Sequence, residues 1–148
     1  MKITTGSIIA LALSLFFVRT VQARNDKYVL PIQAALETKN VFGKPDGSVK
    51  FFYGKQRTPQ IISRLGSEVT HGRVAKLRNT DEIVCGAAFL GALLALHKRA
   101  KQVGANAVVN IVSFYQQVEM SSGSEFECHA GMTAHVYLKG ELVKINEE

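Results

Sequence analysis

Hydrophobic and polar positions change period along the chain, and each period predicts a different element. Over residues 85–103, apolar residues recur at spacings of three and four, which predicts an amphipathic helix of about 20 residues. Asn79 and Thr80 offer a helix start, and Gly104 offers a stop. Small residues on this helix favour close packing against a sheet: Gly86, Ala87, Ala88, Gly91 and Ala92.

A period of two follows the helix and predicts strands. Residues 105–115 are strongly β-forming, and residues 126–138 alternate until Lys139 and Gly140 end the run. The face expected to point inward carries Phe126, Cys128, Ala130, Met132, Ala134, Val136 and Leu138. The face expected to point outward carries Glu127, His129, Thr133, His135 and Tyr137. A short final strand is predicted at residues 142–145.

Shorter elements are predicted before the helix. Residues 28–32 favour an edge strand, and residues 34–37 a single helical turn. Residues 49–53 favour a second strand, with residues 59–65 as its hairpin partner and residues 68–70 as a further strand. This order predicts an α+β fold, a single domain in which one long amphipathic helix packs across an antiparallel sheet.

The first residues are expected to be a targeting segment rather than part of the fold. After Lys2, residues 8–18 are almost wholly apolar, and small residues follow at 21–23. The apolar run is shorter than the about 20 residues that cross a bilayer, so an uncleaved anchor is the less favoured alternative. We predict a signal peptide at residues 1–23 and a single domain at residues 24–148 that is periplasmic or secreted, without a membrane anchor.

The chain has two cysteines, Cys85 and Cys128. An exported protein with an even cysteine count usually pairs them, so one structural disulfide is predicted. Closing a loop of about 43 residues stabilises a fold by roughly 4 kcal/mol in the loop-entropy treatment. Cys85 lies in the first turn of the predicted helix and Cys128 on the inward face of the last long strand, which suits this pairing. A redox-active thiol or a metal ligand is the alternative, although the chain has no Cys-x-x-Cys motif.

Composition and charge narrow the choice of partner. The chain is 47% hydrophobic and 20% charged, which is typical of globular proteins rather than disordered ones. Its formal net charge of +6 falls by two when the predicted signal peptide is removed. Basic residues form no block of five, and export separates a protein from the chromosome, so we expect no nucleic acid as partner. A protein or an anionic component of the cell envelope is the expected partner.

Two segments, residues 85–110 and residues 127–131, carry a likeness to known proteins. They resemble a group of small exported bacterial proteins often labelled "excinuclease ATPase subunit", over about residues 30–144. Residues 100–108, Ala-Lys-Gln-Val-Gly-Ala-Asn-Ala-Val, more distantly resemble the YbjQ-type family, described as heavy-metal-binding. They are also similar to the sensor lipoprotein of the Rcs envelope-stress phosphorelay. These resemblances imply a stress-associated envelope module, a disulfide from the helix to a later strand, and the option of a homo-oligomer.

No catalytic signature stands out in the chain. An ATPase of the excinuclease class needs a Gly-x-x-x-x-Gly-Lys-Ser/Thr loop to hold phosphate, and neither Gly43-Lys44 nor Gly54-Lys55 belongs to one. A cysteine nucleophile assisted by His129 is disfavoured, because neighbouring strand residues point to opposite faces. We therefore predict a non-enzymatic binding or stress-associated module, with no catalytic residue and no cofactor.

Metal binding is the alternative function, with His129, His135 and Glu127 as weak candidate ligands among four histidines that also include His71 and His97. On one continuous strand, His129 and His135 would lie about 20 Å apart at roughly 3.3 Å per residue and would not share an ion. We expect Glu127 and His129 to be solvated surface residues, and His97 to lie at the edge of the packed helix face. Convergence of two histidines with a carboxylate would favour the metal alternative.

Overall fold

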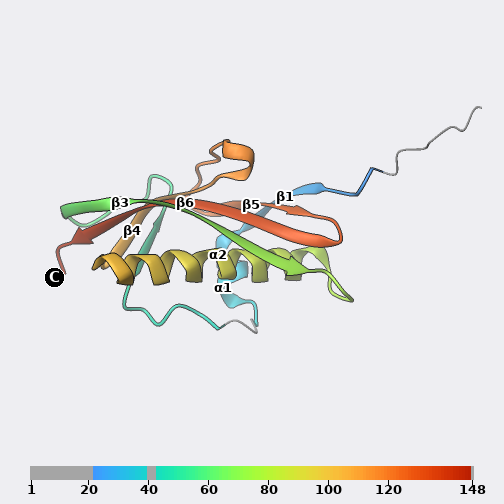
Figure 1. Cartoon of the computed structure of the whole chain (residues 1–148), viewed down its shortest axis with the longest axis horizontal. Helices are drawn as coiled ribbons and strands as arrows, with labels where there is room; N and C mark the ends of the chain where they lie inside the picture. The colour runs from blue at the N-terminus through green and yellow to red at the C-terminus, as the bar shows by residue number, and fades with distance from the viewer. Residues whose placement is uncertain (1–21, 40–42, 148) are drawn as a thin grey trace, which may run out of the picture.

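A curled, six-stranded sheet carries one long helix across one of its faces (Figure 1). The computed structural model describes residues 22–39 and 43–147. The strands are β1 (Asp26–Pro31), β2 (Lys50–Tyr53), β3 (Ile61–Ala75), β4 (Ala107–Ser113), β5 (Glu125–Ala130) and β6 (Thr133–Ile145). The helical segments are α1 (Ile32–Glu37), α2 (Asp81–Val103) and the short 3₁₀ turn η1 (Tyr115–Gln117). The predicted α+β class is confirmed, whereas the predicted signal peptide lies outside the described residues apart from Gln22 and Ala23.

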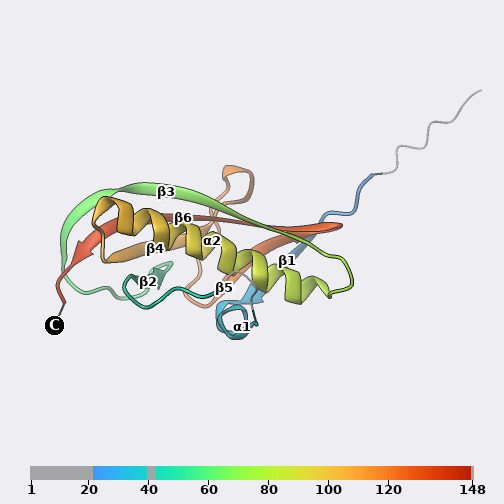
Figure 2. The same cartoon turned by 60° about the horizontal axis from the view of Figure 1, so that its bottom comes forward.

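Helix α2 begins and ends where the residue spacing predicts. The Thr80 hydroxyl accepts a hydrogen bond from the Ile83 amide, and Gly104 ends the helix in the left-handed region at φ 77°. One broad face of α2 packs on the sheet (Figure 2) and buries Val84, Phe89, Leu90, Leu93 and Leu96 against Phe126, Val136, Leu138 and Leu142. By length and composition α2 suffices to cross a membrane, but 67% of its most apolar window is buried within the fold.

Two contacts fix α2 close to the sheet. The predicted disulfide is present, and it joins Cys85 in the first turns of α2 to Cys128 on β5 with the Cα atoms 5.8 Å apart. On β3, Gly72 lies against the backbone of α2, where an added Cβ would lie 1.7 Å from the Ala88 carbonyl oxygen. A side chain at position 72 is therefore incompatible with this packing.

The first residue of α2 anchors the helix to the chain around it. The Asp81 carboxylate is buried and accepts hydrogen bonds from Lys76 Nζ at 2.8 Å, the Tyr28 hydroxyl at 2.6 Å and Arg24 Nη2 at 2.9 Å. The hydrogen bonds from Lys76 and Tyr28, together with the charge of Arg24, lower the pKa of Asp81 to about 2.

The strand order differs in part from the predicted one. The sheet runs β1-β5-β6-β4-β2, and β3 pairs with β6. Every pair is antiparallel except β2 with β4, which is parallel. The predicted hairpin of residues 49–53 with residues 59–65 is therefore wrong, and residues 61–75 form one strand. Strand β3 pairs with β6 from Ile61 to Ala75 and is not available to β2. Strand β2 pairs instead with the outer edge of β4.

The alternating run at residues 126–138 is two strands rather than one. The chain reverses at Gly131 and Met132, so Met132 lies 88% exposed in the turn instead of facing inward. Strand β6 then continues through Gly140 to Ile145. Ala130 pairs with Ala134, so three residues lie between the paired positions and even-numbered residues stay on the same face of the sheet through the turn. The pattern therefore could not reveal the reversal. As a result, the outward residues of β5 and β6 become neighbours across the sheet.

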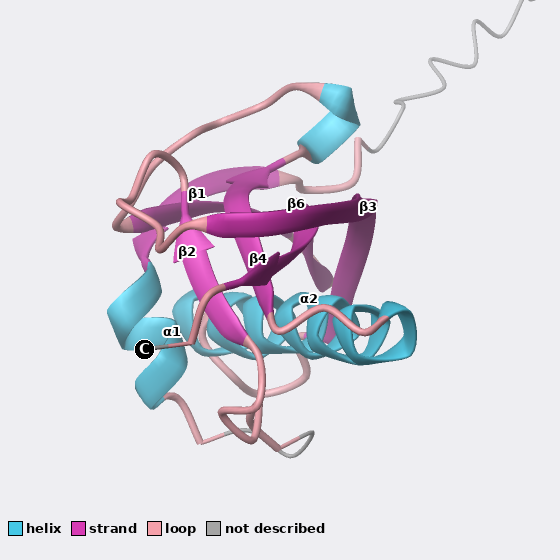
Figure 3. Ribbon diagram, turned by 90° about the vertical axis from the view of Figure 1, so that its left-hand side faces the viewer, coloured by secondary structure: helices cyan, strands magenta, loops and turns pink. Residues whose placement is uncertain are grey.

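The two faces of the sheet have different environments. Even-numbered residues of β6 from Ala134 to Leu142 point toward α2, and odd-numbered residues point to the other side, which we call the open face. The segment between β4 and β5, with η1, crosses the open face (Figure 3). At the far end of β6 a small cluster covers this face: Ala107, Val109, Val143 and Ile145, with Phe52 and Ile61.

Candidate functional site

Five rings gather on the open face from three strands and η1. We call this group the histidine–tyrosine cluster, and its members are His71, Tyr115, His129, His135 and Tyr137. The reversal at residues 131–132 makes His129 and His135 direct cross-strand partners. The expected separation of about 20 Å is therefore wrong, because it assumed one continuous strand.

The tightest contact in the cluster joins two imidazoles. Nε2 of His71 on β3 lies 3.0 Å from Nδ1 of His135 on β6, so one ring donates a hydrogen bond and the other accepts it. His71 also stacks on Tyr137, with ring centroids 4.1 Å apart and planes within 5°. The three rings thus form a ladder across two neighbouring strands.

Both imidazoles favour the neutral form. Burial lowers the pKa of His71 first, and the positive charge of Arg73 adds to the effect. Burial likewise lowers the pKa of His135, followed by the charges of His71, Arg73 and His129. When both imidazoles are neutral, the N–H of one ring donates to the lone pair of the other, and the two rings carry no charge at neutral pH.

Glu127 and His129 form a buried pair rather than the solvated one that the sequence predicts. Their exposed fractions are 9% and 8%, and Glu127 Oε1 lies 2.5 Å from His129 Nε2. Tyr115 covers His129 with ring centroids 3.4 Å apart, and the Asn25 amide donates a hydrogen bond to the Tyr115 hydroxyl at 3.0 Å. Lys27 on β1 places its Nζ 3.5 Å from Glu127. Coverage by η1 and β1 explains why these polar residues are inaccessible.

The fourth histidine lies apart from the cluster. His97 on α2 bonds Asp46 at 2.9 Å and Ser48 at 3.2 Å, and it sits at the edge of the packed helix face as predicted. Hydrogen bonds from Ser48 and then His97 hold the pKa of Asp46 well below its usual range. Among the residues that the structure describes, no group of three or more His, Cys, Asp or Glu side chains is arranged to hold a metal ion. The cysteines are both in the disulfide, so no thiol nucleophile remains.

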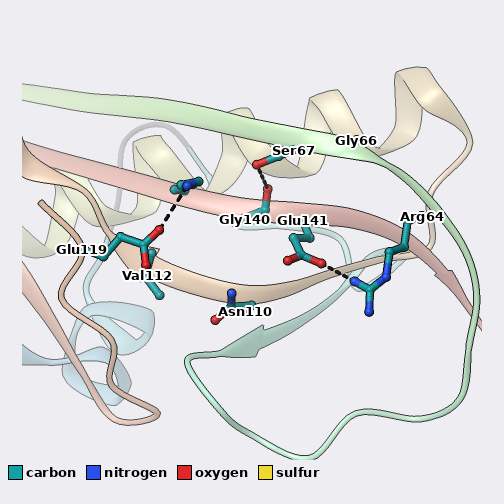
Figure 4. Close-up of a pocket in the computed structure, with 9 residues that line it drawn as sticks. Arg64, Gly66, Ser67, Asn110, Val112, Glu119, Gly140 and Glu141 are labelled. Atoms are coloured by element: carbon teal, nitrogen blue, oxygen red, sulfur yellow. Dashed lines mark hydrogen bonds and ion pairs between the residues drawn. The ribbon is translucent and has the colours of Figure 1, made fainter. Parts of the chain in front are cut away.

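A polar depression of about 640 Å³ adjoins the cluster further along β6 (Figure 4). Lys139 and Glu141 of β6 form its floor, and each makes an ion pair, Lys139 with Glu119 at 3.0 Å and Glu141 with Arg64. Asn110 of β4 lies between these two ion pairs. This site was not predicted from the sequence. Its only signal is that Asn110 interrupts an otherwise apolar run.

Irregular pairing on both sides of β6 shapes the depression. On β4, Val109 pairs with Glu141 and Val112 with Lys139, so Asn110 is the extra residue of a bulge and has φ 50°. On β3 the register also shifts between Arg64 and Gly66. Bulges bend strands and re-aim side chains, which accounts for a hollow at this level of the sheet.

A scan against protein-family models gives no match, and a search of curated proteins gives none either.

Proposed function

We propose that this is an exported, non-enzymatic binding module of the cell envelope, and that the histidine–tyrosine cluster is its binding surface. One observation carries the proposal. Five rings lie on the face opposite α2, where they add nothing to the main core, yet their mutual contacts hold them in fixed positions. Four of the five rings are at least partly exposed, all but His129, and ordered, partly exposed aromatic residues are the kind that anchor protein interfaces.

Two further features support export. The apolar run at residues 8–18 has the length of a secretory signal core. The buried disulfide between Cys85 and Cys128 suits an oxidising compartment. The chain's net positive charge favours an envelope partner of negative charge, since opposite charge speeds encounter.

The proposal is tested by photocrosslinking in cells that express the full chain. A photoreactive residue at Tyr115 is expected to give a covalent adduct in the periplasmic or secreted fraction. The same residue at Lys98, on α2 away from the open face, serves as the matched control. His135→Ala combined with the probe at Tyr115 should reduce the adduct. Equal adducts from both probe positions, or a chain that stays in the cytoplasm, would contradict the proposal.

A second candidate, binding of a divalent transition metal, is favoured by the contact between His71 and His135. Two nitrogens that share a tetrahedral zinc ion lie roughly 3.3 Å apart, given Zn–N bonds of about 2.0–2.1 Å. The observed 3.0 Å between His71 Nε2 and His135 Nδ1 is close to that spacing. A carboxylate beside the two histidines would strengthen this candidate, but Glu127 contacts His129 rather than His71 or His135.

Calorimetric titration with Zn²⁺ and with Cu²⁺ tests this second candidate. His71→Ala and His135→Ala should each abolish binding, while His97→Ala should leave it unchanged, because His97 lies outside the cluster. Affinity should weaken as the pH falls and the imidazoles protonate. Unchanged binding in both cluster variants, or no heat with either ion, would refute a site at this pair.

A further inference from the structure

The depression between Lys139 and Glu141 presents charges of alternating sign along one strand. Lys139 and Glu141 are two residues apart on β6 and lie on the same face, which places them roughly 6.6 Å from each other along the strand. Arg64 and Glu119 extend the alternation at the two ends (Figure 4). A ligand with one positive and one negative end can pair with Glu141 and Lys139 by displacing their present partners, Arg64 and Glu119.

These charges are available to a ligand. The side chains of Arg64 and Glu119 are 64% and 53% exposed, and those of Lys139 and Glu141 are 36% and 39% exposed. Ion pairs as exposed as these are weak, since water screens them. Rearranging them to contact a ligand costs little.

Asn110 supplies the hydrogen-bonding group between the charges. Its side-chain amide makes no hydrogen bond to any residue that the structure describes. In contrast, Asn106 on the chain just before β4 uses its amide on both backbone groups of Ile145. The bulge holds Asn110 at φ 50° and presents it on the open face. An amide in this place matches the donor and acceptor of a peptide group.

We infer that the depression around Asn110 binds a short zwitterionic peptide of dipeptide length. The free carboxylate contacts Lys139, the free ammonium contacts Glu141, and the peptide group bonds Asn110. A dipeptide in an extended conformation spans roughly 6–7 Å between its charged ends, close to the roughly 6.6 Å that separates the backbones of Lys139 and Glu141 along β6. This inference does not rest on the histidine–tyrosine cluster.

The test is an NMR titration of the ¹⁵N-labelled protein with L-alanyl-L-alanine. Saturable shifts are expected at the amides of residues 66–67, 110–112 and 139–141, with a dissociation constant below about 10 mM. The same dipeptide with its amino end acetylated and its carboxyl end amidated has no charge, and it should bind at least about tenfold more weakly. No saturable shift, or equal shifts with both peptides, would overturn the inference.

Variants separate a binding role from a structural one. Asn110→Gly keeps a backbone that tolerates positive φ and removes the amide, so it should weaken dipeptide binding by about tenfold while the melting temperature holds. Glu141→Gln should weaken binding similarly. His135→Ala should leave dipeptide binding intact, which distinguishes this site from the proposed partner surface. Unchanged affinity in Asn110→Gly and Glu141→Gln contradicts the inference.

Discussion

Gly72→Ala should strongly destabilise this fold, although it adds only one methyl group. The added Cβ would lie 1.7 Å from the Ala88 carbonyl oxygen and 2.9 Å from the Ala92 amide nitrogen. A carbon and a carbonyl oxygen approach no closer than about 3.3 Å, so the strand and helix must separate by roughly 1.5 Å. Both clashing atoms belong to the backbone of α2, which the Thr70 hydroxyl also holds through the Ala92 carbonyl at 2.8 Å. Overpacking costs about 1–3 kcal/mol, and we expect the upper end here.

Gly91→Ala is the matched control for Gly72→Ala, because it adds a methyl group on the other side of the same contact. Its Cβ would lie 3.7 Å from the Gly72 Cα, which is ordinary contact distance. Replacing a helical glycine removes an entropic cost of about 0.5–1 kcal/mol, so this variant should be stabilised. Urea unfolding of the oxidised protein measures both, with an unchanged slope. A free energy of unfolding for Gly72→Ala within about 0.5 kcal/mol of the wild type would show that this contact tolerates a side chain.

Three further outcomes are expected. Replacing Cys85 and Cys128 together with alanine should lower the free energy of unfolding by roughly 4 kcal/mol in urea, and reduction of the wild type should match it. Because the folded protein lowers the pKa of His71 and His135, their contribution to stability should be full above about pH 6.5 and should be lost progressively as the pH falls below that value. Urea curves at several pH values measure this, and His71→Gln with His135→Gln should flatten the dependence. Asp81, whose pKa is lowered to about 2, should support stability above about pH 4 and lose that support as the pH falls through 2. Asp81→Asn should abolish this acid-dependent loss, as thermal melts from neutral to acidic pH would show.

The long helix and the disulfide were predictable because their signals are local. The caps at Thr80 and Gly104 act within one turn, and the spacing of apolar residues between them defines the buried face. Once the helix crosses the sheet, Cys85 and Cys128 are placed to meet. None of these inferences needs knowledge of which strands pair.

Strand pairing was harder to predict because alternating apolar and polar residues do not show where a strand ends and the chain reverses direction. The turn at Gly131 and Met132 preserves the alternation, so the pattern reads the same for one strand or two. That ambiguity concealed the cross-strand contact of His129 with His135. The depression was also missed, because a bulge depends on the partner strand and Asn110 alone does not specify one.

Alternate residues of β6 face two environments, the core beneath α2 and the open face that carries both proposed sites. Even-numbered residues from Ala134 to Leu142 pack under α2, whereas His135, Tyr137, Lys139 and Glu141 form one row on the open face. Changes in that row remove few core contacts, so they should alter binding while the free energy of unfolding stays nearly constant. The row joins the histidine–tyrosine cluster to the depression, and two sites of different chemistry therefore lie on one strand. Because both sites lie on β6, titrating one ligand in the presence of the other measures directly whether they bind independently, and we expect that they do.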